Sequence, residues 1–329
     1  MAKRAKRVEP KIEVIGIGSL NYDYTYQVDA LAHGDQQVVI NNTFGSPGGS
    51  AANSIFVLGR LGVKTGFFGA VGTDPEGEEI IEQMVQVGID ITSVKRVSDQ
   101  ATGQVLVFVD RSGERAMYSL PGANVKLTIN DIDIDYLRNS KYLIISAIPG
   151  KQALNMLIRT IEQLSSSQSP QIIFMPGALY SSLGLKVIKP IIEKTYILVL
   201  NRREFKLLVN SNSSSVVDMQ KLTKIGCTNV VITAGKDGCV LKSNGSFIKI
   251  PTPELSPNLI IDSTGAGDAF TAGLIYGLVI GKSFQVSCFM GNLLARNCLQ
   301  ALGARSGSIN KVKLENEFKR FSKEILYEQ

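Results

Sequence analysis

The chain has 329 residues, 44% of them hydrophobic and 19% charged, which is enough for one large α/β domain or two smaller ones and excludes a disordered chain. Its 35 basic and 29 acidic residues give a net charge of +6. Residues 1–11 carry +4 of this charge, from five basic residues less Glu9, so the rest of the chain is nearly neutral. A nearly neutral body argues against a nucleic-acid binder. The single histidine, His33, excludes a multi-histidine metal site and disfavours Ser-His-Asp or Cys-His catalysis.

The cysteines and the apolar segments of the sequence indicate in which cellular compartment the protein lies. The four cysteines show no Cys-x-x-Cys spacing, which is typical of buried reduced thiols. The basic start runs into Val8-Glu9-Pro10, unlike a signal peptide, and the most membrane-like stretch, residues 269–281, has thirteen residues where a spanning helix needs about 20. We therefore expect a cytoplasmic protein with a frayed basic tail at 1–11, one domain over 12–329, and neither a membrane nor a nucleic-acid partner.

The first half of the chain mixes apolar runs with alternating ones. Glycine pairs, a capping Thr73-Asp74-Pro75 and a closing Gly88 mark the helix ends. In chain order we expect strands at 12–17, 22–28 and 37–44, a helix after 48–53, a strand at 65–71, a helix from 75 to about 88, and a hairpin of strands 103–109 and 114–120.

After residue 140 the expected strands are short and almost wholly apolar, and helical segments separate them. They lie at 142–146, 172–175, 196–200 and 230–233, followed by a hairpin at Asn244-Gly245, apolar helices from Gly265 and about Ser283, and a charged amphipathic helix at the end of the chain. This pattern predicts a doubly wound, mostly parallel α/β sheet. The alternating strands near 22–44 and 103–120 do not fit that sheet and are predicted to form a small antiparallel β lid attached to it.

The most informative run is residues 262–270, Asp-Ser-Thr-Gly-Ala-Gly-Asp-Ala-Phe. A glycine-rich turn that leads directly into a helix lets several backbone N–H groups converge on an anion, and the helix dipole adds positive potential there. Asp268 beside such a site favours phosphoryl transfer, because a carboxylate can take the proton of an attacking hydroxyl while the amides stabilise the transferring group. The alternative is an ordinary helix cap with a flexible approach.

Two earlier runs are candidates for binding a polyhydroxylated acceptor. Residues 48–53 place paired glycines before a helix, where a ligand can approach the backbone, and Asn53 offers both a donor and an acceptor. Asn21 and Asp23 follow the first strand, at the edge of an α/β sheet where substrates bind. A plain strand-to-helix turn and a polar turn explain these two runs equally well.

Two later runs are candidates for the nucleotide side of the site. Asn201 starts a helix after a buried strand, and Glu204 either completes a capping box with it or lies near magnesium and the phosphates through water. Residues 233–238 form another strand-to-turn segment, along which a nucleotide could lie. By itself that segment is an ordinary turn.

Taken together, from about residue 12 to 307, these runs resemble the ribokinase-like (PfkB) family of sugar and nucleoside kinases. The resemblance implies a doubly wound sheet with a β lid, Mg²⁺ and ATP as cofactors, and transfer to a hydroxymethyl group. It implies that the catalytic base is Asp268 and that the anion hole is formed by Gly265, Ala266 and Gly267. It implies that the sugar is bound by Asn21, Asp23, Gly49 and Asn53, and that magnesium is contacted through water by Glu204. The implied nucleotide contacts are Asn201, Thr233 and Gly235, and the implied site of a monovalent cation (K⁺ in activated members) is Asp262 and Thr264.

Three positions depart from the pattern of ribokinases proper. Ser50 stands where they have lysine, Ala147-Ile148 where they carry a glutamate toward the sugar, and Met175 where many relatives have Asn or Asp before proline. The first two argue against strict ribose specificity, and a methionine cannot bind magnesium-bound water. We therefore expect an ATP-dependent kinase of a small sugar, with a nucleoside kinase as the alternative and a homodimer through the lid as a further expectation.

Two interpretations outside the kinase class remain. Gly16-x-Gly18 after the first strand suggests a nicotinamide oxidoreductase, but the third glycine position is Asn21 and a strand-like segment follows in place of a helix. A non-catalytic sugar-binding relative is disfavoured by the intact Asp268 and glycine turn. A coupled assay with Mg-ATP over a panel of sugars and nucleosides discriminates all of these.

Overall fold

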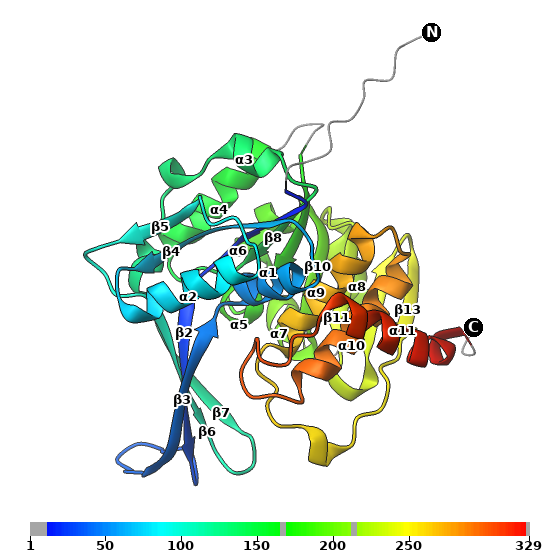
Figure 1. The fold of residues 1–329 in the computed structure, drawn as a ribbon. Helices are drawn as coiled ribbons and strands as arrows, with labels where there is room; N and C mark the ends of the chain where they lie inside the picture. The colour runs from blue at the N-terminus through cyan, green and yellow to red at the C-terminus, as the bar shows by residue number, and fades with distance from the viewer. Residues whose placement is uncertain (1–11, 165–168, 212–215, 327–329) are drawn as a thin grey trace.

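A computed structural model describes residues 12–164, 169–211 and 216–326 (Figure 1). The expected basic tail at 1–11 lies outside the described residues. The chain forms one large sheet with helices on both faces and a small second sheet that projects from it. The predicted fold class, a doubly wound and mostly parallel sheet with a β lid, is confirmed.

The large sheet has nine strands in the order β13-β12-β11-β10-β9-β8-β1-β4-β5. The strands from β5 to β11 in this order pair in parallel, and β12 and β13 add an antiparallel edge hairpin. Their bounds are β1 Val14–Ile17, β4 Thr65–Gly72, β5 Val94–Val97, β8 Tyr142–Ser146, β9 Gln171–Met175, β10 Thr195–Asn201, β11 Asn229–Thr233, β12 Cys239–Ser243 and β13 Ser246–Ile250.

Alternate side chains of the buried strands enter two separate cores, one on each face of the sheet. In β8, Tyr142 and Ile144 pack in one core and Leu143 and Ile145 in the other. The first core is completed by α1 Ser50–Arg60, α2 Pro75–Gln86, α9 Ala266–Val279, α10 Phe284–Cys298 and α11 Lys311–Leu326. The second is completed by α3 Ile134–Arg138, α4 Lys151–Leu164, α5 Gly177–Ser181, α6 Leu185–Ile192, α7 Arg202–Val209 and α8 Val216–Lys224.

The lid is a four-stranded sheet in the order β3-β2-β6-β7, with bounds β2 Asn21–Val28, β3 Ile40–Gly48, β6 Gly103–Val109 and β7 Arg115–Leu120. Its two hairpins are antiparallel, and they join through a parallel pairing of β2 with β6. The strand expected at 37–44 lies instead at 40–48, because β3 pairs with β2 from Val28 opposite Ile40 to Asn21 opposite Gly48. The base of the lid therefore ends directly at helix α1.

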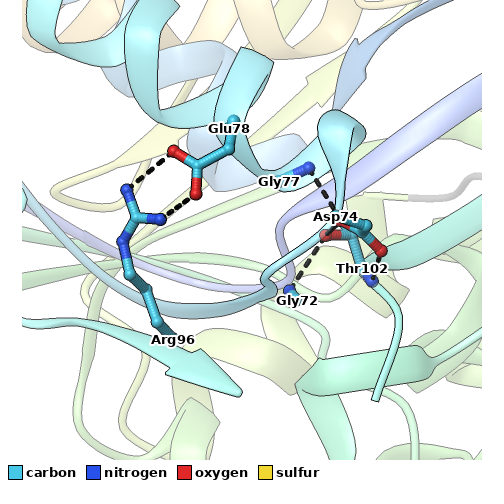
Figure 2. Close-up of polar contacts among 6 residues, drawn as sticks. All are labelled: Gly72, Asp74, Gly77, Glu78, Arg96 and Thr102. Atoms are coloured by element: carbon cyan, nitrogen blue, oxygen red, sulfur yellow. Dashed lines mark hydrogen bonds and ion pairs between the residues drawn. The ribbon is translucent and has the colours of Figure 1, made fainter. Parts of the chain in front are cut away.

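A cluster of polar contacts fixes the point where the chain enters the second lid hairpin (Figure 2). Asp74 caps α2 by accepting from Gly77 N at 2.9 Å, and the same carboxylate accepts from Thr102 N at 2.6 Å, one residue before β6. Thr102 in turn accepts from Gly72 N at 2.9 Å. The predicted helix start at Asp74 is thus confirmed, and the same carboxylate also holds the lid to the body.

Strand β5 was not expected from the sequence. Its four residues, Val-Lys-Arg-Val, lie at the edge of the sheet and are only partly buried, so they lack the continuous apolar pattern of the central strands. Within the described part of the chain, no helix is long and apolar enough to span a membrane.

Candidate functional site

The carboxyl ends of the central parallel strands meet at one edge of the sheet. The pairing aligns Ile17 with Ile145, Ser146 with Met175, and Asn201 with Thr233. The lid leaves the body at the end of β1, and α9 begins close to the same edge, because Ser54 of α1 donates to the Asp268 carbonyl at 2.9 Å. The lid base and the start of α9 therefore lie near the carboxyl ends of these strands, where ligands of open α/β sheets typically bind.

Helix α9 begins at a turn that suits an anion. Its N-cap, Gly265, has φ 77°, and a Cβ there would lie 2.5 Å from the Cβ of Ala304, so no other residue fits. A Cβ on Gly267, in contrast, would have no neighbour within 4 Å. The first turn of α9, Gly265, Ala266 and Gly267, thus has open space at Gly267, and the helix dipole directs positive potential to this end. The Ala266 N–H donates to the Ser263 carbonyl at 3.4 Å.

Asp268 lies in the first turn of α9 and is only partly exposed. Asn53 Nδ2 donates to Asp268 Oδ2 at 2.9 Å, and the Ser50 hydroxyl also hydrogen-bonds this carboxylate. Burial raises the pKa of Asp268 to about 7, against the opposing effect of these two hydrogen bonds and with help from the charges of Asp23 and Glu204. A carboxylate with a pKa near neutrality is suited to accept a proton from a hydroxyl group.

Asp23 lies at the lid base, where β2 passes Gly48. A Cβ on Gly48 would come 2.2 Å from Asp23 Oδ2, so the glycine makes room for the carboxylate. Asp23 Oδ1 is buried and has no hydrogen-bond partner among the described protein atoms. Burial raises the pKa of Asp23 to about 6, against the charge of Arg305. An unpartnered buried acceptor is costly unless a ligand satisfies it.

The other residues expected to grip the acceptor lie around Asp23. Asn21 Oδ1 accepts from Asn124 Nδ2 at 3.0 Å, which fixes its side chain at the start of the lid. Gly49 has φ 99°, and a Cβ there would lie 2.2 Å from the Ser19 carbonyl, so this N-cap of α1 needs glycine. Asn53 is 3% exposed, and the backbone bond from its N–H to the Gly49 carbonyl is 2.8 Å.

Arg305 is a site residue that sequence reasoning missed. Its side chain is buried, and its Nε donates to Asn53 Oδ1 at 3.0 Å. The guanidinium lies 5.0 Å from the centroid of the Phe56 ring. Burial lowers the pKa of Arg305 to about 10, while the charges of Asp23, Asp268 and Glu79 act to raise it. No pattern marks this arginine in the loop after α10 as different from other arginines.

Asn201 and Glu204 form the capping box that was one of their two expected roles. Asn201 Oδ1 accepts from Glu204 N at 2.8 Å, and Glu204 Oε2 accepts from Asn201 N at 2.9 Å. Burial raises the pKa of Glu204, and the charge of Glu204 acts on Asp268. Thr233 ends β11 beside Asn201, and Gly235, at φ 60°, starts the next turn, where a Cβ would have no neighbour within 4 Å.

The loop before α9 is tied to both the lid and the body. Asp262 Oδ1 accepts from Thr264 N at 2.9 Å, and Asp262 Oδ2 accepts from Gly303 N at 2.9 Å. Arg115 of β7 reaches across from the lid and donates to Thr264 Oγ1 at 3.0 Å. A cleft of about 870 Å³ lies between lid and loop, lined on the lid by Thr25, Phe44 and Val107 and on the body by Ile260, Ile261 and Leu302.

The acidic side chains of the site bear on whether it can bind a divalent cation. No group of three or more His, Cys, Asp or Glu side chains within the described ranges is arranged to hold a metal ion by itself. Glu204 nevertheless offers a carboxylate in the first turn of α7, near enough to α9 that its charge acts on Asp268. This arrangement fits Mg²⁺, which proteins usually bind through one or two carboxylates together with substrate phosphates and water.

Comparisons with known proteins identify the family of the chain. Residues 11–311 match the pfkB family carbohydrate kinases. The chain is 30% identical, over 76% of its length and 97% of the relative's, to an uncharacterized sugar kinase of Archaeoglobus fulgidus, and 27% identical, over 83% and 84%, to a nucleoside kinase of Methanothermobacter thermautotrophicus. The Arabidopsis thaliana ribokinase complexed with ribose and ATP has the same fold, with a TM-score of 0.81 at 21% identity over 94% of this chain and 99% of that one. The chain therefore belongs to the pfkB family of carbohydrate kinases, which makes it a phosphotransferase of the sugar and nucleoside kinase class.

Proposed function

We propose that this kinase transfers the γ-phosphoryl group of ATP to a hydroxymethyl group of a small sugar. The observation that carries the proposal is the closeness of three features, namely Asp268 with its bond from Asn53, the N-terminus of α9, and the buried Asp23, whose Oδ1 has no partner and whose charge acts on Asp268. The relatives named above are sugar and nucleoside kinases, which supports the same class of acceptor.

In this mechanism Asp268 is the general base. Its carboxylate takes the proton from the acceptor hydroxyl as the hydroxyl oxygen forms its bond to the γ-phosphorus and the bond from that phosphorus to the β–γ bridging oxygen breaks. Asn53 Nδ2, at 2.9 Å from Oδ2, holds the carboxylate during this step. Because the pKa of Asp268 is about 7, the base is matched to a reaction near neutral pH.

The charge of the transferring group is stabilised by the backbone. Gly265, Ala266 and Gly267 offer N–H groups at a helix N-terminus, already oriented before the reaction begins. Arg115, held 3.0 Å from Thr264 Oγ1, adds a positive charge from the lid beside this turn. Lid closure thereby completes the site and excludes water from it.

The acceptor and the nucleotide have separate contacts. Asn21, Asp23, Gly49 and Asn53 bind acceptor hydroxyls at the lid base, and the buried free oxygen of Asp23 gains its partner there. Asn201, Thr233 and Gly235 bind the nucleotide at the ends of β10 and β11. Glu204 would hold Mg²⁺ through water, and the metal would neutralise charge on the phosphates. Asp262 and Thr264 would hold a monovalent cation in the loop before α9.

The test is a coupled ADP-release assay of the purified chain with Mg-ATP against ribose, fructose, ketodeoxygluconate, adenosine, cytidine and inosine. We expect magnesium-dependent phosphorylation of at least one acceptor, and a rate about 10²–10⁴-fold lower with Asp268→Asn. Turnover of nicotinamide cofactors with 2-hydroxy acids, and no ATP consumption over the whole panel, would refute the proposal.

One observation favours a nucleoside as a second candidate acceptor. The cleft of about 870 Å³ between the lid and residues 257–264 is much larger than a pentose, and it presents Phe44 and Val107 opposite Ile260 and Ile261. A nucleobase is flat and apolar on its faces, so this space could hold one beyond the sugar. Nucleoside kinase activity is expected to weaken in Ile261→Asp, whereas phosphorylation of a free sugar would be unaffected by that change.

We also propose that a second copy of the chain packs on the lid. Met117 and Tyr118 on β7 are each 61% exposed, Leu120 is 51% exposed and Val39 is 75% exposed. Neighbouring side chains of a strand point to opposite faces, so apolar side chains are exposed on both faces of β7. Exposed apolar side chains on a projecting sheet are typical of an interaction region. Sedimentation of the native chain and of Met117→Glu tests this proposal. A native dimer that becomes a monomer in Met117→Glu would support it, and a native chain that is already a monomer would refute it.

A further inference from the structure

Arg305 is a buried cation whose role the reaction scheme above leaves open. The residue is 7% exposed, and burying a guanidinium is costly unless its hydrogen bonds and charge are matched. Its Nε donates to Asn53 Oδ1 at 3.0 Å, and its other nitrogens lie 3.4 Å from the Gly48 carbonyl and 3.5 Å from Gln83 Oε1. The side chain therefore joins α1, α2 and the lid base.

The backbone around Arg305 is fixed to the turn that starts α9. Gly303 N donates to Asp262 Oδ2 at 2.9 Å, and Ala304 lies so close to Gly265 that a Cβ on this glycine would be 2.5 Å from the alanine Cβ. The arginine thus follows directly after residues that contact the turn at the start of α9, and it bonds a different atom of the Asn53 amide than Asp268 does.

Asn53 links the arginine to the catalytic base. Its amide oxygen accepts from Arg305 Nε at 3.0 Å, and its amide nitrogen donates to Asp268 Oδ2 at 2.9 Å. A primary amide can turn by 180°, which exchanges its donor and its acceptor. Arg305 can only donate, so it permits one of the two orientations, the one in which Asn53 donates to the carboxylate.

Charge gives Arg305 a second effect on the same carboxylate. The titratable groups that act on or respond to Asp268 are Asp23 of β2, Glu204 of α7, Cys298 of α10 and Arg305. The first two are carboxylates that disfavour its ionised form, and Cys298 is a neutral thiol whose pKa is raised to about 12 by burial. Of these, Arg305 is the group that favours ionisation of Asp268.

We propose that Arg305 is a positioning residue for phosphoryl transfer, which fixes the amide of Asn53 so that it holds the carboxylate of Asp268 and which offsets the two neighbouring carboxylates. The inference rests on the proposed function for its kinetic consequences. The effect of Arg305 on the protonation of Asp268 does not depend on which acceptor the enzyme uses, or on whether the assay panel contains that acceptor.

The test compares Arg305→Met, Arg305→Lys and the control Arg296→Met. Arg296 is matched to Arg305, since its Nε also donates to an oxygen, the Glu254 carbonyl at 3.3 Å, and its guanidinium also lies over a ring, Phe321 at 5.2 Å. Melting temperatures establish that each variant is folded. If Arg305→Met fails to fold, the milder Arg305→Lys carries the kinetic comparison.

In Arg305→Met we expect kcat to fall by about 10-fold to 100-fold, as is usual when a reacting group loses its orientation. The acidic limb of kcat/KM is expected to move up by about one pH unit, the lower end of the range for a lost opposite charge. Arg305→Lys keeps the charge, so its pH limb should return toward that of the native enzyme while kcat remains lowered. Arg296→Met should match the native enzyme in both respects.

Two further measurements separate this inference from the proposed function. In an Asn53→Ala background, Arg305→Met should cost much less in kcat than in the native chain, because the link is already broken. Carboxyl-carbon NMR, with the Asp268 signal assigned by its loss in Asp268→Asn, should show Asp268 titrating at higher pH in Arg305→Met, whether or not an acceptor is known. An unchanged titration, or equal losses in kcat with and without Asn53, would overturn the inference.

Discussion

Replacing Asp268 by asparagine should remove most of the activity and yet stabilise the fold. Burial raises the pKa of Asp268 from 3.8 to about 7, so the folded protein holds this proton more tightly than the unfolded chain. Between these two values the folded state binds more protons, and the free energy of unfolding falls as the pH rises. Above pH 7 the ionised group destabilises the fold by up to about 4 kcal/mol, from about 3 pH units at 1.36 kcal/mol each.

Asparagine has almost the same shape and no charge, so the variant avoids this cost. Urea unfolding should show Asp268→Asn to be more stable than the native chain by up to about 4 kcal/mol at pH 8, and by less than about 1 kcal/mol at pH 4, where Asp268 is neutral in the folded protein and only partly ionised in the unfolded chain. In the coupled assay kcat should fall by about 10²–10⁴, the range for loss of a general base. Asp135→Asn is the control, since its carboxylate is 90% exposed and pairs with the nearby Arg138.

Two results would contradict this reasoning. A stability gain that is equal at pH 4 and pH 8, or a loss at pH 8, would mean that the ionised carboxylate is well solvated in the folded protein. A kcat within about threefold of the native value, on the order of 0.7 kcal/mol in barrier, would show that another group accepts the proton.

Three further outcomes are expected. Asp23→Ala should raise the acceptor KM by about 10-fold to 100-fold, because charge-assisted hydrogen bonds contribute roughly 1.5–3 kcal/mol each, and it should leave the ATP KM nearly unchanged; a lower melting point with a normal acceptor KM would assign Asp23 to the scaffold. Potassium should raise the rate relative to choline at equal ionic strength if Asp262 and Thr264 hold a cation, and equal rates in the two salts would dismiss that site. Arg115→Gln should lower kcat/KM by about 10-fold, and the loss should be larger at low salt than at high salt. A variant with native kinetics would show that Arg115 only contacts the body from the lid.

The fold was predictable where a local pattern has one physical cause. The apolar runs that became β8 to β11, the capping Asp74 and the hairpin at Asn244-Gly245 each depend on neighbouring residues alone, and the structure has them within a residue or two of the expected bounds. The start of β3 was wrong by three residues, because pairing with β2 sets the register and this pairing is not visible in the strand's own alternation.

The site was predictable only in pieces. The run from Asp262 to Phe270 carries its own signal, a glycine turn followed by a helix, and the structure has α9 starting there. The contact of Asn53 with Asp268 joins residues 215 positions apart, so no spacing rule predicts it, and only the family resemblance put both residues in one site. Arg305 belongs to no motif, and its role depends on burial, which follows from packing that the sequence does not state.

The bond from Arg305 to Asn53 spans 252 residues of the chain, and it has a consequence for how the enzyme is made. Synthesis proceeds from the N-terminus, so the lid and the first strands leave the ribosome long before the loop that follows α10. A nascent chain that ends before residue 262 has the residues proposed to bind the acceptor but neither the proposed base, Asp268, nor Arg305. Phosphoryl transfer is therefore expected only after nearly the whole polypeptide has emerged, and shorter translation products are expected to be inert.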